Sequence, residues 1–219
     1  MKKPRICAVI VNNDLKAIKE VEPLVDLLEV RIDLIGDGWQ ELVNYLEKPW
    51  IGCNRCADEG GRWDGDEVGR IDELLKAIEL GADIIDIELR TRNLKSAVEQ
   101  IRQGAKCLLS FHDLEGMPNI NSMKEIIQNQ LEMGADVCKV VTTAQRLKDN
   151  LIVLQLISEF PRTRMVSFAM GPLGLLSRVL CPLVGGDFTY ASIEQGKESA
   201  SGQITVSELR QIYEMASKC

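Results

Sequence analysis

Residues 5–14 read RICAVIVNND, an apolar and largely β-branched run that ends in three polar residues. Similar short runs recur along the chain, and a longer stretch with helical periodicity follows each of them. We expect strands at residues 5–11, 27–34, 50–54, 83–89, 106–111, 137–142, 163–168 and 188–192. We expect helices near residues 15–25, 39–47, 66–80, 93–103, 121–133, 144–158, 174–183 and 205–217.

Strands that alternate with helices predict a parallel sheet, and eight such units favour an α/β fold of the (β/α)₈ TIM-barrel type. The alternative is an open, doubly wound sheet, which would place a Gly-rich phosphate loop after its first strand. The turn at 11–14, VNND, contains no glycine, so we predict the barrel. No linker or low-complexity segment interrupts the 219 residues, which predicts one catalytic domain over residues 1–219.

The composition excludes several classes of protein. Because 45% of the residues are hydrophobic and evenly spread, the chain is not intrinsically disordered. No window approaches about 18 uncharged apolar residues, and the first apolar run is too short for a signal peptide, so we expect a cytoplasmic protein without membrane contact. A formal charge of −7 argues against a general nucleic-acid binder, although a local basic patch stays possible.

The cysteines fit a reduced protein without a metal centre. The chain has seven, at Cys7, Cys53, Cys56, Cys107, Cys138, Cys181 and Cys219. Cys53 and Cys56 form a CxxC pair, but a zinc site needs a second pair or histidines, and there is only one histidine. A thioredoxin-like pair would open a helix, whereas this one ends an expected strand. We expect ordinary packing for both thiols.

Charged residues occur where a buried strand should have none. In LLEVRIDL, residues 27–34, Glu29, Arg31 and Asp33 alternate with apolar residues. Residues two apart in a strand point to the same face. The opposite face of a barrel strand meets the helices and has to be apolar, so we expect the charged triplet to point into the barrel.

Polar residues near three further strands point to the same interior: Asp86, Glu88 and Arg90 on the fourth, Ser110 and His112 on the fifth, and Lys139 on the sixth. Burying a charge is costly unless the charge is paired. Groups from at least four strands that face one volume are therefore explained more economically by an active site than by separate accidents.

Structural explanations stay open for several of these residues. Glu29 and Arg31 could form an ion pair that closes the barrel. Glu88 and Arg90 could pair at the rim, which is the interpretation that we favour for Arg90. A lone His112 could be a hydrogen-bonded core histidine.

Lys139 is harder to explain by packing, because it lies mid-strand among valines, where a lysine can rarely reach water. A neutral amine in a dry pocket attacks carbonyl carbons and forms a Schiff base. The single histidine, His112, beside such an imine suggests proton abstraction from the carbon next to a carbonyl.

Seven motifs in chain order connect these residues to a known family. They are Glu29-Val30-Arg31-Ile32-Asp33, Asn54-Arg55 with Glu59-Gly60-Gly61, Ile85-Asp86-Ile87-Glu88-Leu89, Ser110-Phe111-His112-Asp113, Lys139-Val140, Met170-Gly171 with Gly174 and Ser177-Arg178, and Ser199-Ala200-Ser201-Gly202-Gln203. With these motifs the chain resembles type I 3-dehydroquinate dehydratase over its whole length. That family is the Schiff-base (β/α)₈ lyase of the shikimate pathway, which serves aromatic amino acid biosynthesis.

The resemblance implies removal of water from 3-dehydroquinate to give 3-dehydroshikimate. Lys139 matches the imine-forming lysine, His112 the general base and acid, and Glu59 the carboxylate that orients the histidine. Arg178 matches the arginine that binds the substrate carboxylate. The implied substrate contacts also include Glu29, Arg31, Arg55, Ser199 and Gln203. Neither a metal nor an organic cofactor is implied, since the lysine is the electron sink, and a homodimer is expected.

Three positions depart from the family pattern: Ser201 replaces the proline of an S-A-P-G-Q lid, Pro172 follows Met170-Gly171, and Leu114 follows His112-Asp113. They leave the chemistry intact and affect the stiffness of the lid and the shape of the pocket. We expect residues 193–203 to be that lid.

Two other functions stay compatible with the residues. One is a different Schiff-base barrel enzyme, such as a class I aldolase, which would form or break a carbon–carbon bond. The other is a catalytically silent barrel that serves as a binding or regulatory module, against which intact Lys139 and His112 argue.

Overall fold

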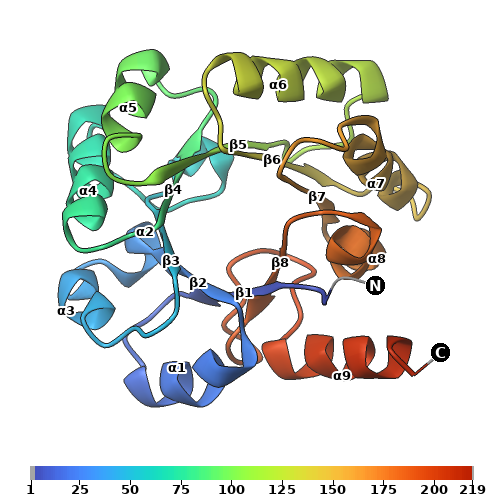
Figure 1. The fold of residues 1–219 in the computed structure, drawn as a ribbon, viewed down its shortest axis with the longest axis horizontal. Coiled ribbons are helices and arrows are strands. Elements are labelled where there is room, and N and C mark those ends of the chain that lie inside the picture. The colour runs from blue at the N-terminus through green and yellow to red at the C-terminus, as the bar shows by residue number, and fades with distance from the viewer. Residues whose placement is uncertain (1–2, 219) are drawn as a thin grey trace.

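The computed structural model describes residues 3–218, and its strands form a ring surrounded by helices (Figure 1). The eight strands are all parallel and follow the order β7-β6-β5-β4-β3-β2-β1-β8. They are β1 Ile6–Ile10, β2 Leu27–Arg31, β3 Trp50–Cys53, β4 Ile84–Glu88, β5 Lys106–His112, β6 Val137–Thr143, β7 Met165–Met170 and β8 Thr189–Ser192.

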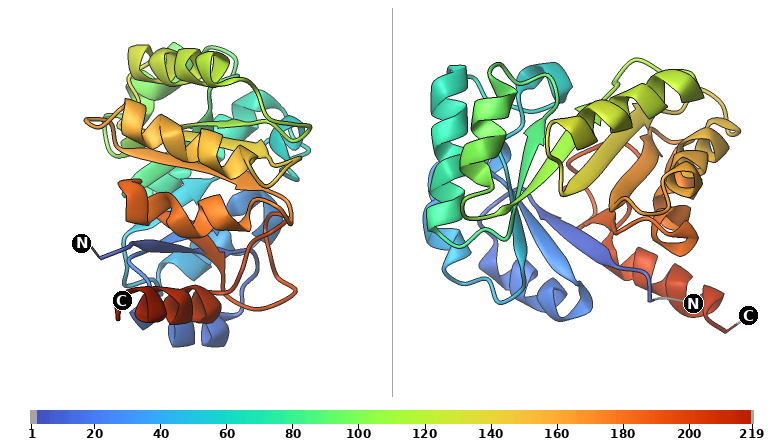
Figure 2. Two further views of the ribbon diagram at one scale, coloured as in Figure 1. Left: turned by 90° about the vertical axis from the view of Figure 1, so that its right-hand side faces the viewer. Right: turned by 45° about the horizontal axis from the view of Figure 1, so that its top comes forward.

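The helices lie outside the ring, as the two further views in Figure 2 make clear. The α-helices are α1 Leu15–Val21, α2 Ile32–Ile35, α3 Trp39–Val43, α4 Glu67–Glu79, α5 Leu94–Ile101, α6 Ile120–Glu132, α7 Asp149–Glu159, α8 Leu175–Leu180 and α9 Val206–Ala216. The 3₁₀ turns are η1 Glu22–Leu24, η2 Ala57–Glu59 and η3 Cys181–Val184. Local capping fixes several starts: Asp14, Asp66 and Asn119 accept backbone N–H groups, and Thr205 forms a capping box with Glu208.

The ring is nearly closed, and this confirms the predicted barrel over the open sheet. Among the described residues, β8 pairs with β1 in parallel, but no strand ladder joins β7 to β8. At that seam the Asp187 N–H donates to the Met165 carbonyl at 2.7 Å. The Phe168 and Tyr190 rings pack edge to face there, with centroids 6.2 Å apart. Loop and side-chain contacts thus complete the barrel where backbone pairing ends.

Strand alternation creates two separate apolar regions. One fills the barrel interior and includes Val9, Ile51, Leu108 and Val166. The other packs the outward strand faces against the surrounding helices. Above the interior apolar layers, towards the carboxyl ends of the strands, the inward side chains become charged, and this is the face where barrel enzymes carry their active sites.

Several expected elements have different limits in the structure, and two of them have a clear local cause or bear on the site. The strand expected at 27–34 ends at Arg31, and Asp33 lies in the short helix α2. The helix expected from residue 144 begins only at Asp149. The Asp149 carboxylate accepts the backbone N–H groups of Gln145 and Arg146 at 2.9 Å, which holds that segment as a turn.

Within residues 3–218 the structure has no helix that is both long enough and apolar enough to cross a membrane.

Candidate active site

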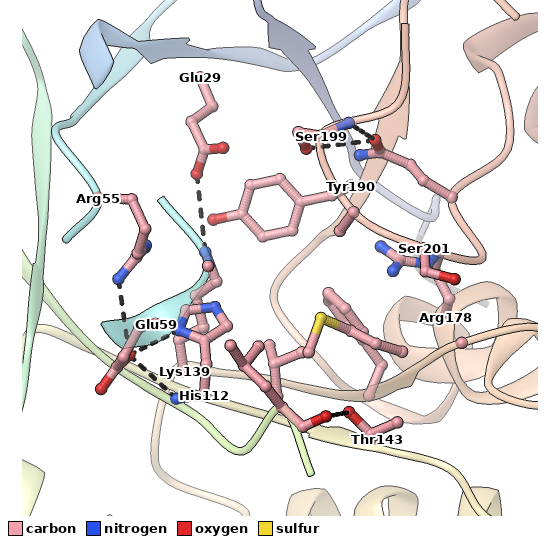
Figure 3. Close-up of a pocket in the computed structure, with 18 of the residues that line it drawn as sticks. Glu29, Arg55, Glu59, His112, Lys139, Thr143, Arg178, Tyr190, Ser199 and Ser201 are labelled. Atoms are coloured by element: carbon pink, nitrogen blue, oxygen red, sulfur yellow. Dashed lines mark hydrogen bonds and ion pairs between the residues drawn. The ribbon is translucent and has the colours of Figure 1, made fainter. Parts of the chain in front are cut away.

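A cavity of about 440 Å³ opens at the carboxyl ends of the strands. Its lining contains all nine residues that the sequence predicted for the site, and Figure 3 shows most of them pointing towards one another. They are Glu29, Arg31, Arg55, Glu59, His112, Lys139, Arg178, Ser199 and Gln203. The barrel therefore gathers residues from β2 through the segment after β8 around one volume.

Lys139 projects from β6 into this cavity and is only 5% exposed. Its Nζ lies 2.8 Å from Asp86 Oδ2 and 3.6 Å from Glu29 Oε1. The same nitrogen lies 4.3 Å from the centroid of the Tyr190 ring. Two carboxylates and one aromatic face thus fix the position of the amine.

Asp86 is the link between Lys139 and Arg55, which follows β3. Arg55 Nη2 lies 2.7 Å from Asp86 Oδ2, and the Ser110 hydroxyl lies 2.6 Å from Asp86 Oδ1. Burial raises the pKa of Asp86, but the neighbouring Arg55 and Lys139 cations outweigh burial and hold that pKa well below its ordinary value. The carboxylate therefore stays ionised between its two cations.

Glu59 and His112 form a second pair beside the amine. Glu59 Oε2 lies 2.8 Å from His112 Nδ1 and accepts the His112 backbone N–H at 3.1 Å. The turn that presents Glu59 needs a glycine at Gly61, because a Cβ there would stand 1.8 Å from the Arg55 carbonyl oxygen. The sequence Glu-Gly-Gly is thus the local cause of this carboxylate's position.

The protonation of this pair suits acid–base chemistry. Burial, together with the Arg55 and Lys139 cations, holds the pKa of His112 well below its ordinary value, so the ring is neutral near pH 7. Burial raises the pKa of Glu59 to about 7, although Arg55 opposes this rise. An ionised Glu59 next to Nδ1 selects the tautomer with its proton on Nδ1, which leaves the Nε2 lone pair free as a base.

Arg178 on α8 is a buried cation without a hydrogen-bonded partner at two of its nitrogens. It is 1% exposed, and its Nε and Nη2 make no hydrogen bond within residues 3–218. The guanidinium carbon lies 4.3 Å from the Phe168 ring centroid. Burial lowers the pKa of Arg178 to about 10. A buried guanidinium of this kind is a site for an anion, and a carboxylate matches its fork.

The segment after β8 covers the cavity on the side of Arg178. Gln203 Oε1 accepts the Ser199 backbone N–H at 2.9 Å. The Gly171 N–H donates to the Ser201 carbonyl at 3.1 Å, which ties the segment to the turn after β7. Ser199, Ser201 and Gln203 all line the cavity.

Comparison with known proteins shows which family the chain belongs to. The family model for type I 3-dehydroquinase matches residues 6–218. The chain belongs to this family. It is accordingly a 3-dehydroquinate dehydratase, a hydro-lyase.

Relatives and solved structures agree with this family membership. The chain is 42% identical over 214 residues to a 3-dehydroquinate dehydratase of Dehalococcoides mccartyi, covering 97% of this chain and 96% of that one. It is 34% identical to the Methanocaldococcus jannaschii 3-dehydroquinate dehydratase over 218 residues, or 96% and 98% of the two chains. The crystal structure of the Geobacillus kaustophilus 3-dehydroquinate dehydratase superposes with a TM-score of 0.87 at 26% identity, covering 99% and 92%.

In this type I 3-dehydroquinase, two ion pairs considered from the sequence do not form. Arg31 donates from Nε and Nη2 to Asp33 at 2.8 and 2.7 Å, so its carboxylate partner is Asp33 and not Glu29. The reason is that the chain turns into α2 directly after Arg31, which brings the Asp33 carboxylate back to the guanidinium.

The rim pair of Glu88 and Arg90 is also wrong for this dehydratase. Glu88 is buried and pairs with Arg70 and Arg55, at 2.5 and 3.2 Å. Arg90 lies in the turn after β4, where its side chain is 59% exposed, 4.4 Å from the Phe111 ring and 4.0 Å from Glu59. Strand alternation does not extend past the end of β4, so Arg90 leaves the face that Glu88 shares with Asp86.

Asp86, Phe168 and Tyr190 are among the residues near the reacting groups that had no role assigned from the sequence: Asp86 holds the Lys139 amine, and the two aromatic rings line the cavity. Asp86 had the signal of a charged residue on the inward strand face. The two aromatic residues gave no signal of their own, because an aromatic residue in a strand normally indicates core packing.

Among the described residues, the two thiols of the CxxC pair do not belong to one group of possible metal ligands. Cys53 is buried and Cys56 is half-buried, and the ligand atoms grouped near Cys53 belong to Glu29 and Asp86, not to Cys56. The Arg55 and Lys139 cations already pair with Asp86 there. Cys219 lies outside the described residues.

Proposed function

We propose that this enzyme dehydrates 3-dehydroquinate to 3-dehydroshikimate through a Schiff base on Lys139. The observation that carries the proposal is the buried Lys139 amine in the same cavity as a neutral His112 and a buried Arg178 that lacks an acidic partner. An amine, a base and an anion site are the groups that a carboxylated ketone needs for elimination of water.

The reaction then follows from the positions of these groups. Lys139 Nζ attacks the ketone carbon, and loss of the carbonyl oxygen as water leaves an iminium. His112 Nε2 removes a proton from carbon 2, and the electron pair passes into the iminium. The resulting enamine expels the hydroxyl at carbon 1, which leaves as water with the proton that His112 returns. Hydrolysis of the remaining imine releases 3-dehydroshikimate and restores the amine.

Carboxylates orient the two reacting groups. Asp86 and Glu29 hold the amine from two sides, at 2.8 and 3.6 Å, while the Tyr190 ring faces it. Glu59 orients His112 and stabilises the cation that forms when the ring takes up a proton.

Other residues of the cavity recognise the substrate. Arg178 binds the carboxylate with its two free nitrogens. Glu29 Oε1 makes no hydrogen bond among the described residues, and Arg31 has Nη1 left over from its contact with Asp33, so both can bind hydroxyl groups. The remaining proposed contacts, which also line the cavity, are Arg55, Ser199 and Gln203.

Borohydride trapping tests the proposal. Reduction in the presence of 3-dehydroquinate should add one ligand per chain, on the peptide that contains Lys139. Lys139→Met should abolish the adduct and turnover. His112→Ala should still be trapped, while turnover falls by roughly 10²–10⁴-fold or more. An adduct on Lys106 or Lys148, or turnover by Lys139→Met, would overturn the proposal, and cleavage of a carbon–carbon bond would indicate an aldolase instead.

Three expectations from the sequence stay predictions: a homodimer, a cytoplasmic location and the extent of the catalytic domain over residues 1–219. Light scattering of the purified enzyme measures the first of them.

A further inference from the structure

Arg70 is a fully buried arginine outside the cavity. It lies on α4, is 1% exposed, and makes five hydrogen bonds. Its fork contacts both Glu67 oxygens at 2.8 and 2.9 Å, the Thr91 hydroxyl at 2.9 Å and the Asn54 carbonyl at 3.1 Å. Nη1 also contacts Glu88 Oε2 at 2.5 Å. The start of α4, the end of β3 and the end of β4 therefore meet at one guanidinium.

The second Glu88 oxygen continues this network into the cavity. Oε1 lies 3.2 Å from Arg55 Nη1 and accepts the Cys56 backbone N–H at 3.1 Å. Arg55 is the residue that holds Asp86 and Ser110. Cys56 opens the turn that ends at Glu59, since its carbonyl accepts the Glu59 backbone N–H at 3.2 Å. Glu88 thus holds both the arginine beside the amine and the turn that carries the histidine's carboxylate.

We propose that Arg70 is a positioning residue for the dehydration, which acts through Glu88 to fix Arg55 and the turn that presents Glu59 to His112. The inference rests on the proposed function, because it assigns the task that the positioned groups perform. Arg70 itself does not line the cavity.

An arginine suits this place for two reasons. Its planar fork satisfies Glu67, Glu88 and a backbone carbonyl at once, which a lysine ammonium cannot do with the same geometry. Its positive charge also compensates the buried Glu88 carboxylate, whose only other cationic partner among the described residues is Arg55. Without Arg70, Glu88 would be a buried carboxylate with too little compensation, free to draw Arg55 away from Asp86.

The charged groups around Glu88 and Glu59 predict how loss of Arg70 changes the pH dependence of kcat. Glu88 faces Arg55, Arg70 and the carboxyl of Glu59. Glu59 in turn faces Arg55, Arg90, His112, Glu88 and Asp86. Because the Glu88 charge raises the pKa of Glu59, loss of Arg70 should raise that pKa further. The fall of kcat on the acidic side of its pH profile (the acidic limb) should then move to higher pH.

Arg70→Met and Arg70→Lys test the inference, with Arg102→Met, at an exposed arginine, as the matched control. Arg70→Met should lower kcat by roughly 10–100-fold with KM changed less than about threefold, because misplacement of reacting groups costs rates of this order. Its acidic limb should move to higher pH. Arg70→Lys should have the acidic limb of the wild type but regain only part of its kcat. Arg102→Met should change neither kcat nor the position of the acidic limb.

A second variant tests the same inference if Arg70→Met does not fold. The double variant Glu67→Gln with Thr91→Val keeps Arg70 and weakens its outer contacts, because it removes the Glu67 charge and the Thr91 hydroxyl, and it should lower kcat several-fold with the KM of the parent. If the folded variants keep the kcat of the wild type and the same acidic limb in the pH profile, the positioning role is overturned, even when their Tm is lower. A wild-type enzyme that gives no Lys139 adduct with borohydride would instead overturn the proposed function, so the two failures are distinguishable.

Discussion

Glu59→Gln should make the enzyme more stable at neutral pH while it removes most of the activity. Glu59 is 4% exposed, and burial raises its pKa from 4.5 to about 7. The folded chain therefore disfavours the ionised carboxylate that the proposed mechanism requires. Glutamine has the same shape and cannot ionise, so it removes this conflict.

The size of the effect follows from the pKa. Each tenfold change in the ionisation constant is worth about 1.4 kcal/mol. A pKa of about 7 in place of 4.5 thus lowers the free energy of unfolding by about 3 kcal/mol once Glu59 is ionised. Between these two pH values the folded chain holds a proton that the unfolded chain has released. The stability that the folded chain has with Glu59 protonated is therefore fully present below about pH 4.5 and is lost as the pH rises to about 7.

Urea denaturation of the two proteins between pH 4.5 and 8 measures the difference directly. The wild type and Glu59→Gln should have similar stability at the acidic end. At pH 8 the variant should be more stable by up to about 3 kcal/mol, and its kcat should be roughly 10²-fold lower because His112 loses its orienting charge. Glu79→Gln, at an exposed carboxylate on α4, is the control and should change stability by less than about 0.5 kcal/mol.

A stability difference that does not vary with pH would refute this reasoning, as would a Glu59→Gln protein that is less stable than the wild type at pH 8. Either result would mean that the neighbouring cations, and not burial, control this carboxyl. Wild-type kcat in the variant would show that His112 needs no charged partner.

Three further predictions concern the substrate, the lid and the cysteines. Arg178→Lys should raise KM by roughly 10–100-fold, because one ammonium replaces a bidentate contact; an unchanged KM would place the substrate carboxylate elsewhere. Gly202→Ala should detach the segment after β8, since Gly202 has a φ of +78° and a Cβ there would lie 2.2 Å from the Gly171 carbonyl oxygen; trypsin should then cleave that segment faster, and an equal rate would contradict a tight lid contact. Cys53→Ser with Cys56→Ser should keep activity within a few-fold and release no metal, whereas stoichiometric zinc in the wild type would contradict packing as their role.

Local patterns in the sequence were sufficient for the barrel and for the inward direction of the charged residues within the strands, but not for Asp33 and Arg90, which lie past the strand ends. The 3.6-residue and two-residue periodicities are properties of neighbouring residues, so the alternation of strands and helices can be read without any tertiary contact. The same alternation placed Glu29, Asp86 and Lys139 on the interior face. The roles of His112, Glu59 and Arg178 depended in addition on the family motifs.

Only the tertiary structure decided which charges pair with one another. Strand alternation fixes the face of a side chain, but its partner depends on barrel register and on the path of each turn. Glu88 meets Arg70 because α4 packs beside β3 and β4, and Arg31 meets Asp33 because the chain bends into α2. Arg178 has two free nitrogens for the same reason: the fold brings it to the cavity without a carboxylate beside it. Glu88 and Arg70 are far apart in sequence, and the neighbouring Arg31 and Asp33 pair only through the path of the chain into α2, so no local periodicity encodes either pair.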